Sequence, residues 1–246
     1  TLTMTFTTAG LTTNGGNVTT TTIGATFGTY AEYPMFSSAN LYAEFSAGFS
    51  NQPVANVTID FGMFRRGATT QFAPTDGIYF RLNSSGMFGV VNNNGSETTS
   101  SVFDFTYLEN KKHQFIISIT EREVEFWIDN VLKGTLKTPI GQGQPFMSST
   151  LPMSIRHAHS GTAGGVINMI LNDYAISMGG PTFVRTLGEA GNAIFGSYQG
   201  LSGGTMGGLT SYTNSTNPTA AVPSNTTLTT NLPSGLGGQA WETVTT

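Results

Sequence analysis

Residues 113–137 read HQFIISITEREVEFWIDNVLKGTLK, and this stretch decides the fold class of the chain. Apolar and polar residues alternate from Phe115 to Ile119 and again over 124–128, and a side-chain period of two is typical of strands with one buried face. Asp129-Asn130 follows as a two-residue turn, because both residues tolerate positive φ. A third short strand over 131–136 completes an antiparallel meander.

The same alternation recurs on both sides of this meander. Segments with an apolar residue at every second position cover 2–6, 41–49, 57–63, 78–82, 88–90, 153–159 and 167–178. We predict turns at Thr75-Asp76-Gly77, 83–86 and 92–95 and a loop over 145–152, while the Thr/Gly-rich residues 7–30 fit either ragged strands or a loop. Each strand has one apolar face to hide, so the pattern predicts an all-β sandwich of two sheets.

Composition excludes several classes of protein. Only 10% of the residues are charged, against roughly 25% in an average soluble domain. The net charge of −4 and the scattered Lys and Arg give no support for a nucleic-acid partner. The chain has no cysteine, which excludes disulfides and thiolate metal sites, and no run of 18 apolar residues that would predict a membrane span.

The character of the chain changes near residue 180. Residues 1–180 carry the strand pattern, whereas 181–246 are rich in Gly and Thr and nearly free of charge. Aromatic and aliphatic residues punctuate this second part, which favours an extended arm, or the start of a further β-module, over a free linker. Both ends of the chain look cut from something longer.

Four segments resemble the concanavalin A-like, laminin G-like jelly roll. They are DGIYFRLNSSGMFGVVNNNGSE at 76–97, HQFIISITEREVEFWIDNVLKG at 113–134, LPMSIRHAHSG at 151–161 and INMILNDYAISMG at 167–179. The resemblance covers roughly residues 40–180. It implies a lectin-like jelly-roll β-sandwich, followed by the Gly/Thr-rich C-terminal arm.

A narrower resemblance concerns structural proteins of tailed bacteriophages. Tyr198-Gln199-Gly200, Gly203-Gly204-Thr205 and the segment YTNSTNP at 212–218 carry it. The resemblance implies a non-enzymatic virion component, decorating a capsid or forming part of a fibre. Its partners would be copies of itself, as in the trimers common among such appendages, and other virion proteins. No cofactor is expected.

The competing hypothesis is a glycan-binding module that adsorbs to a host surface. Jelly rolls of this class bind glycans through aromatic platforms together with Asp and Asn side chains. Trp127 faces away from the core in the alternation of its strand, so it is either a stacking platform or covered by a neighbouring chain. The candidate residues are Asp76, Tyr79, Arg81, Asn83, Asn92, Asn94, Trp127 and Asp129.

Two further patterns suggest chemistry. Glu121, Glu123 and Glu125 would share one side of a strand, as the carboxylates of retaining glycanases on this jelly roll do. The family usually has Asp in the middle position, and the triplet straddles a predicted turn, so we interpret these residues as solvated surface and assign no catalytic residue. His157 and His159 also share a strand face and could bind a metal ion, or sit half-buried at a sheet rim.

Overall fold

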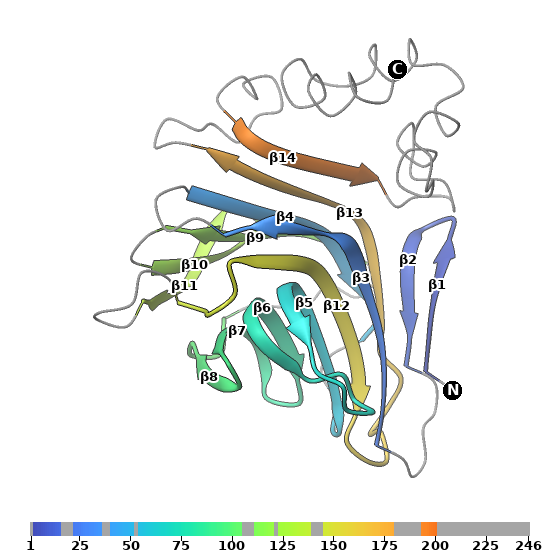
Figure 1. Cartoon of the computed structure of the whole chain (residues 1–246). Helices are drawn as coiled ribbons and strands as arrows, with labels where there is room; N and C mark the ends of the chain where they lie inside the picture. The colour runs from blue at the N-terminus through green and yellow to red at the C-terminus, as the bar shows by residue number, and fades with distance from the viewer. Residues whose placement is uncertain are drawn as a thin grey trace.

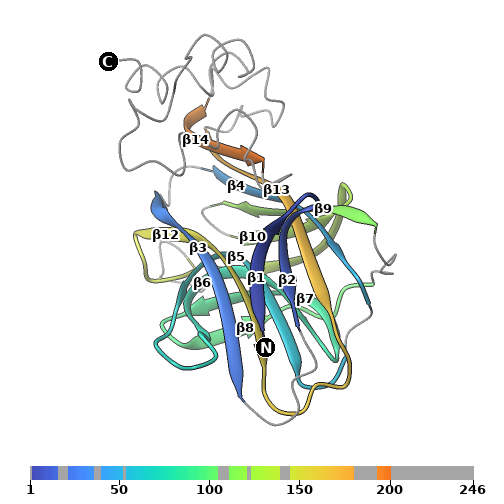
Figure 2. The same cartoon turned by 90° about the vertical axis from the view of Figure 1, so that its right-hand side faces the viewer.

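The computed structural model describes residues 2–15, 22–35, 40–51, 54–104, 111–120, 123–138, 145–179 and 193–200. Within these ranges the chain forms strands and turns, and two sheets pack face to face (Figures 1 and 2). The predicted all-β sandwich of two sheets is confirmed. The described residues include no helix that could cross a membrane.

The larger sheet has eight strands in the order β1-β2-β13-β4-β9-β10-β11, and β14 also pairs with β13. Their bounds are β1 Thr3–Thr7, β2 Gly10–Asn14, β4 Asn40–Phe49, β9 Lys112–Ile119, β10 Glu123–Ile128, β11 Val131–Lys137, β13 Asn168–Gly179 and β14 Ala193–Gly200. The smaller sheet has the order β3-β12-β5-β6-β7-β8. Its strands are β3 Ile23–Pro34, β5 Val57–Arg66, β6 Pro74–Asn83, β7 Gly86–Asn93, β8 Ser96–Thr99 and β12 Thr150–His159.

The predicted meander is confirmed as β9, β10 and β11, which pair antiparallel in the larger sheet. Asp129 and Asn130 have φ values of 50° and 65°, which are the left-handed conformations of a type I′ hairpin. The predicted Asn94-Gly95 hairpin between β7 and β8 has the same character, with φ values of 49° and 88°. The sequence therefore identified both tight turns correctly.

The prediction of a turn at Thr75-Asp76-Gly77 is wrong, because these residues lie inside β6. Gly77 has a φ of 133°, and a Cβ atom there would overlap the carbonyl oxygen of Met63 on β5. Glycine is needed at this position because two strands approach closely, and the same residue type favours turns elsewhere.

Three boundaries differ from the prediction. The Thr/Gly-rich segment 7–30 contains β2 and most of β3, so the strand alternative is the correct one. The predicted loop over 145–152 ends earlier, since β12 begins at Thr150. The segment predicted over 167–178 is the single strand β13, Asn168–Gly179.

The segment predicted as a C-terminal arm lies mostly outside the described residues. Its described part, β14, pairs antiparallel with β13 from Asp173↔Gly200 to Gly179↔Ala193. Residues 193–200 therefore extend the larger sheet of the sandwich (Figure 1). The division of the chain at residue 180 stays a prediction.

The core between the sheets centres on phenylalanine rings. Phe61 of β5 and Phe80 of β6 stack with ring centroids 5.2 Å apart. The ring of Phe115, from the opposite sheet, lies edge-on against both, with centroids at 5.1 and 5.4 Å. Phe126 of β10 meets Phe80 at 5.2 Å, and Gly89 of β7 leaves the room that the Phe126 ring needs. This packing fixes which face of each strand points outward.

Candidate functional site

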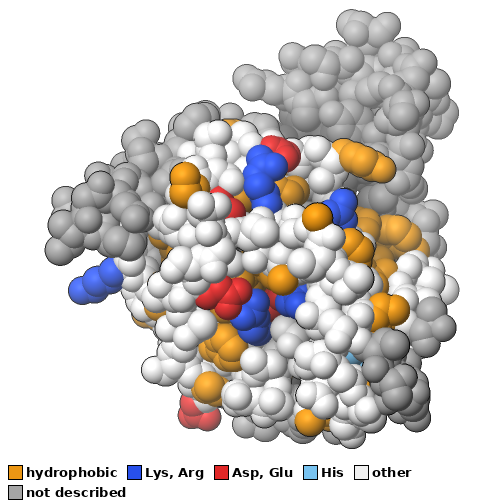
Figure 3. Space-filling model, turned by 60° about the horizontal axis from the view of Figure 1, so that its bottom comes forward, with side chains coloured by type: hydrophobic (Ala, Val, Ile, Leu, Met, Phe, Trp, Pro, Cys, Tyr) orange, Lys and Arg blue, Asp and Glu red, His pale blue; other side chains and the backbone are white. Residues whose placement is uncertain are grey.

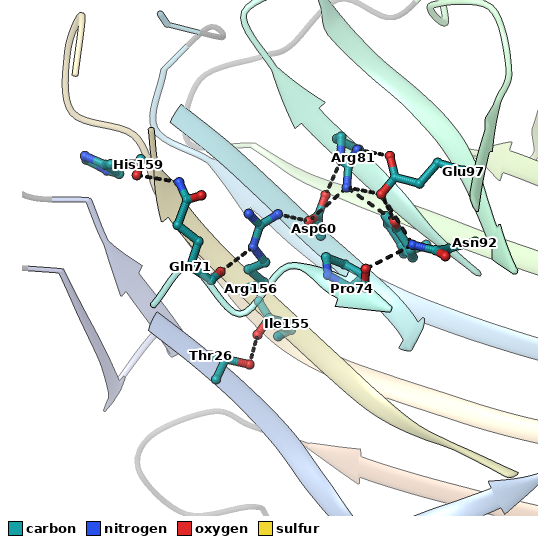
Figure 4. A network of polar contacts seen from close by, with 11 residues as sticks. Thr26, Asp60, Gln71, Pro74, Arg81, Asn92, Glu97, Ile155, Arg156 and His159 are labelled. Carbon is teal, nitrogen blue, oxygen red and sulfur yellow. Dashed lines mark hydrogen bonds and ion pairs between the residues drawn. The ribbon is translucent and has the colours of Figure 1, made fainter. Parts of the chain in front are cut away.

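The outer face of the six-stranded sheet carries a cluster of charged side chains. Because Phe61 and Ile155 point into the core, their strand neighbours Asp60 and Arg156 point to the outer face. Figure 3 shows acidic and basic side chains gathered on this side of the molecule, and Figure 4 shows how they connect. We define the polar cluster as Asp60, Tyr79, Arg81, Asn92, Glu97 and Arg156.

Asp60 of β5 is the centre of this cluster. Its side chain is fully buried and bridges two guanidinium groups, with Arg81 Nε donating to Oδ1 at 2.7 Å and Arg156 Nη1 donating to Oδ2 at 2.5 Å. Buried charges are tolerated when they are paired and hydrogen-bonded in this way. The three strands β12, β5 and β6 are thus joined across their outer face by one carboxylate.

Glu97 of β8 completes the cluster at the surface. Arg81 donates from Nη1 to Glu97 Oε2 at 2.6 Å and from Nη2 to Oε1 at 3.0 Å, which is a bidentate pair. The hydroxyl of Tyr79 donates to the same Oε1 at 2.7 Å. The Glu97 side chain is 32% exposed and that of Arg81 14%, so this pair is the part of the cluster that a ligand can reach.

Hydrogen bonds and neighbouring charges keep both Arg81 and Glu97 ionised. Burial alone would raise the pKa of Glu97, but the hydrogen bonds from Arg81 and Tyr79 hold that pKa below its ordinary value. Burial alone would lower the pKa of Arg81, but Asp60 and Glu97 outweigh it and raise the pKa. Both groups therefore carry charge at neutral pH.

Neighbouring segments hold the polar cluster in place. Arg156 Nε donates to the carbonyl of Gln71 at 2.6 Å, and the amide of Gln71 donates to the carbonyl of His159 at 2.8 Å (Figure 4). On the other side, Asn92 Nδ2 donates to the carbonyl of Pro74 at 3.0 Å. Residues 71–74, which lead into β6, are thereby held by hydrogen bonds at both ends.

An aromatic side chain lies on the strand next to Arg81. Phe88 is half-buried and is the cross-strand partner of Arg81 in the pairing of β7 with β6. It packs against a small apolar cluster of Phe64, Tyr79 and Val90 on the outer face. The outer face thus combines a half-buried aromatic ring with a fixed donor and acceptor.

The eight predicted glycan-binding residues do not gather in one place. Tyr79, Arg81 and Asn92 lie in the polar cluster. Two turn residues lie at the ends of β6 and β7: the Asn83 side chain accepts a hydrogen bond from the amide of Ser85, and Asn94 forms the tight hairpin.

Asp76 lies outside the polar cluster and holds neighbouring backbone segments together. Its carboxylate accepts hydrogen bonds from the backbone amides of Asn94, Met147 and Ser148 at 3.2, 3.0 and 2.7 Å. A buried carboxylate with three such donors fixes the hairpin and the segment before β12 against β6.

Trp127 and Asp129 belong to the other sheet. Trp127 is half-buried and faces away from the core, as its alternation predicts, and its Nε1 donates to Glu125 at 3.0 Å. Asp129 accepts from the Gln114 amide at 2.9 Å and pairs with His113 at 2.6 Å. The sequence showed the outward direction of Trp127 but could not show which sheet it would join.

Of the three glutamates predicted to share one side of a strand, the structure describes two. Glu121 lies outside the described residues, while Glu123 and Glu125 are half-buried on β10. Glu125 receives the indole hydrogen bond of Trp127. Glu123 and Glu125 thus belong to the larger sheet, whereas the polar cluster is on the smaller one.

Sequence reasoning missed Asp60, Glu97, Arg156 and Phe88. Each has the outward register of its strand, so the alternation contained a signal for its direction. Phe88 and Glu97 come near Arg81 through the consecutive hairpins of β6, β7 and β8, whose turns the sequence predicts. Arg156 meets Asp60 only because β12 pairs with β5, and a single sequence does not reveal that distant pairing.

The two candidate metal ligands, His157 and His159, are fully buried rather than half-buried, and His159 is the last residue of β12. Both are fully buried on the inner face of β12, with ring centroids 5.3 Å apart. His157 Nδ1 lies 3.1 Å from Thr13 Oγ1, whereas His157 Nε2 and both ring nitrogens of His159 have no hydrogen-bond partner among the described residues. Within the described ranges no three His, Asp or Glu residues gather as a metal site would require, so a metal ion here stays a prediction.

Comparison with known proteins identifies the fold alone. No protein-family model matches the chain, and a search of curated proteins finds no match. Among solved structures, the carbohydrate recognition domain of Emp47p is similar with a TM-score of 0.51 at 7% identity, over 72% of this chain and 86% of that one. The carbohydrate-binding module CBM66 from Bacillus subtilis gives a TM-score of 0.44 at 10% identity, over 70% and 88% of the two chains. The alginate lyase AlgAT5 gives 0.36 at 10% identity, over 63% and 62%.

Asp60→Ala should strongly destabilise the protein. The substitution leaves Arg81 and Arg156 without their shared buried partner, and breaking a buried ion pair costs about 3–5 kcal/mol. Asp173→Ala is the control, because its partner Lys112 is 3.5 Å away and 58% exposed, and we expect a loss below about 1 kcal/mol. Urea unfolding measures both, and equal losses would contradict this role of Asp60.

The protein should lose stability between pH 7.5 and pH 5. Burial lowers the pKa of His157 from 6.5 to about 3, with smaller effects of His159 and Arg156. Stability from neutral His157 is therefore complete above pH 6.5 and declines as the pH falls, by about 2 kcal/mol at pH 5. Urea unfolding at both pH values should show a smaller loss for His157→Gln than for the wild type. An identical loss in both proteins would count against His157 as the cause.

Proposed function

We propose that the outer face of the six-stranded sheet is a non-catalytic carbohydrate-binding surface. The observation that carries the proposal is Phe88, a half-buried residue opposite Arg81 in the sheet, while Arg81 itself forms a partly exposed pair with Glu97. Sugar sites combine an apolar surface with a few fixed polar groups, and these three residues provide both. The Emp47p structure supports the proposal, since that similarly folded domain is a carbohydrate recognition domain.

Binding fits the polar cluster better than cleavage does. A glycosidase needs one carboxylic acid with a raised pKa and a second carboxylate beside the scissile bond. The pKa of Glu97 is lowered instead, and Asp60 is buried between two arginines. The charged side chains are thus engaged in holding one another, and we assign no residue to acid–base chemistry.

We also propose that this module is part of a tailed-phage virion. The proposal rests on the sequence resemblance carried by Tyr198-Gln199-Gly200, which forms the end of β14 beside β13. The low charge supports it, because uncharged surface can be buried between subunits without stranding an ion. In this setting the partners are copies of the chain and other virion proteins, and the ligand is a host-surface glycan.

Loss of the Phe88 ring should reduce glycan binding about tenfold, because an aromatic side chain contributes about 1.5–3 kcal/mol when fully buried and part of that is lost. The test is a glycan array probed with the wild type, Phe88→Ala and Trp127→Ala. Trp127→Ala is the matched control, since it removes a half-buried aromatic residue from the other sheet. Binding that depends on Trp127 and not on Phe88 would place the glycan site on the eight-stranded sheet instead. Absence of any bound glycan would refute the proposed function.

The virion proposal predicts that the protein is present on intact particles. Antibodies raised against residues 1–180 should label purified tailed-phage particles of the source in negative-stain electron microscopy, at a fixed place on head or tail. Pre-absorbing the antibodies with the purified protein provides the control. Purified particles that lack the protein in mass spectrometry would contradict a virion role and leave the glycan proposal intact.

A further inference from the structure

We infer that the outer face selects an uncharged sugar. Arg81 and Glu97 hold this sugar by hydrogen bonds to two of its neighbouring hydroxyl groups. The inference rests on the proposed carbohydrate-binding function and specifies its ligand. Three properties of the polar cluster carry it: its balance of charge, the hydrogen-bonding positions that remain free, and the placement of Phe88.

The charges of the polar cluster cancel. Asp60 and Glu97 supply two negative charges, and Arg81 and Arg156 supply two positive charges, all within one hydrogen-bonded network. The next cation along β5, Arg65, is itself paired with Glu32 at 2.7 Å, and Arg66, at the end of the strand, is exposed and outside the polar cluster. A uronate or sulfate arriving at the Arg81–Glu97 pair would find no surplus positive charge within the polar cluster and would lie next to the Glu97 carboxylate.

The network leaves one donor and one acceptor free side by side. The guanidinium of Arg81 has five N–H groups. Nε serves Asp60, and the two hydrogens of Nη2 are shared among Glu97 Oε1, the Tyr79 hydroxyl and Asp60 Oδ2. Nη1 has a single acceptor among the described residues, Glu97 Oε2, so its second hydrogen is available.

Glu97 has the matching acceptor. Its Oε1 receives hydrogen bonds from Tyr79 and Arg81 and a longer one from Asn92, whereas Oε2 receives only that of Arg81 Nη1 within the described residues. A carboxylate oxygen can accept two hydrogen bonds, so Oε2 has one position left. The free donor and the free acceptor belong to atoms 2.6 Å apart.

This pair of positions suits a vicinal diol. Each hydroxyl of a sugar can donate and accept, so one hydroxyl donates to Glu97 Oε2 while its neighbour accepts from Arg81 Nη1. Both contacts involve a charged group and are therefore stronger than neutral hydrogen bonds. Phe88, across from Arg81 in the sheet, offers its ring to the C–H face of the same sugar.

The test compares sugars that differ only in charge. Mannan, galactan and β-glucan oligosaccharides would be immobilised beside the same oligosaccharides with the primary hydroxyl oxidised to a carboxylate. We expect the wild type to bind at least one uncharged oligosaccharide ten times or more tightly than its oxidised form. Mild periodate, which cleaves vicinal diols, should abolish that binding.

Glu97→Gln tests the charge balance directly. The variant keeps an amide of the same shape beside Arg81 but leaves the cluster with one surplus positive charge. We expect binding of the uncharged sugar to fall about tenfold and the preference to shift toward the oxidised form, with the shift weakened by added salt. Thermal unfolding of the variant confirms that it is folded before binding is measured.

The outcomes separate the two proposals. A wild type that binds none of these sugars and no other glycan refutes the proposed function. A wild type that binds oxidised sugars as tightly as uncharged ones, or that keeps its binding after periodate, overturns the diol inference while carbohydrate binding stands. Neither result depends on the folding of a variant.

Discussion

The interlocking of phenylalanine rings between the two sheets is the constraint on which the remaining structure depends. Phe61 and Phe80 enter the core from the smaller sheet, and Phe115 and Phe126 enter from the larger one. Rings at these distances allow little sliding, since protein interiors are as densely packed as organic crystals. The register of the central strands is therefore determined by contacts on their inner face.

The same register arranges the outer face. Side chains alternate along a strand, so the position that sends Phe61 inward sends Asp60 outward, and Ile155 has the same relation to Arg156. A slip of one residue would bring charged groups into the aromatic core, which makes it energetically prohibitive. Inner packing and outer chemistry are thus two results of one alignment, and the polar cluster needs no separate scaffold.

Local pattern explains what the sequence could predict. The alternation of β9 and β10 and the Asp129-Asn130 and Asn94-Gly95 hairpins depend on neighbouring residues, so a single chain reveals them. Tyr79 and Arg81 were chosen for their residue types, and they share a face because they lie two residues apart on β6. Arg156 reaches Asp60 only through the pairing of β12 with β5, which lie far apart in the sequence, and nothing local indicates which sheet Trp127 joins. Glu97 reaches Arg81 across the consecutive hairpins of β6, β7 and β8, so local pattern contained a signal for that contact.

The edges of the sandwich limit how copies of the chain can associate. β3 and β8 stand at the two ends of the smaller sheet, and β11 stands at one end of the larger. These strands carry exposed charged residues in a chain that has few of them, namely Glu32, Glu97 and Lys137, and β3 also has Pro34, which lacks an amide hydrogen. Such residues oppose the joining of sheets strand to strand. Higher-order contacts at these borders must therefore use side-chain surfaces, and the module is protected there against runaway fibril growth.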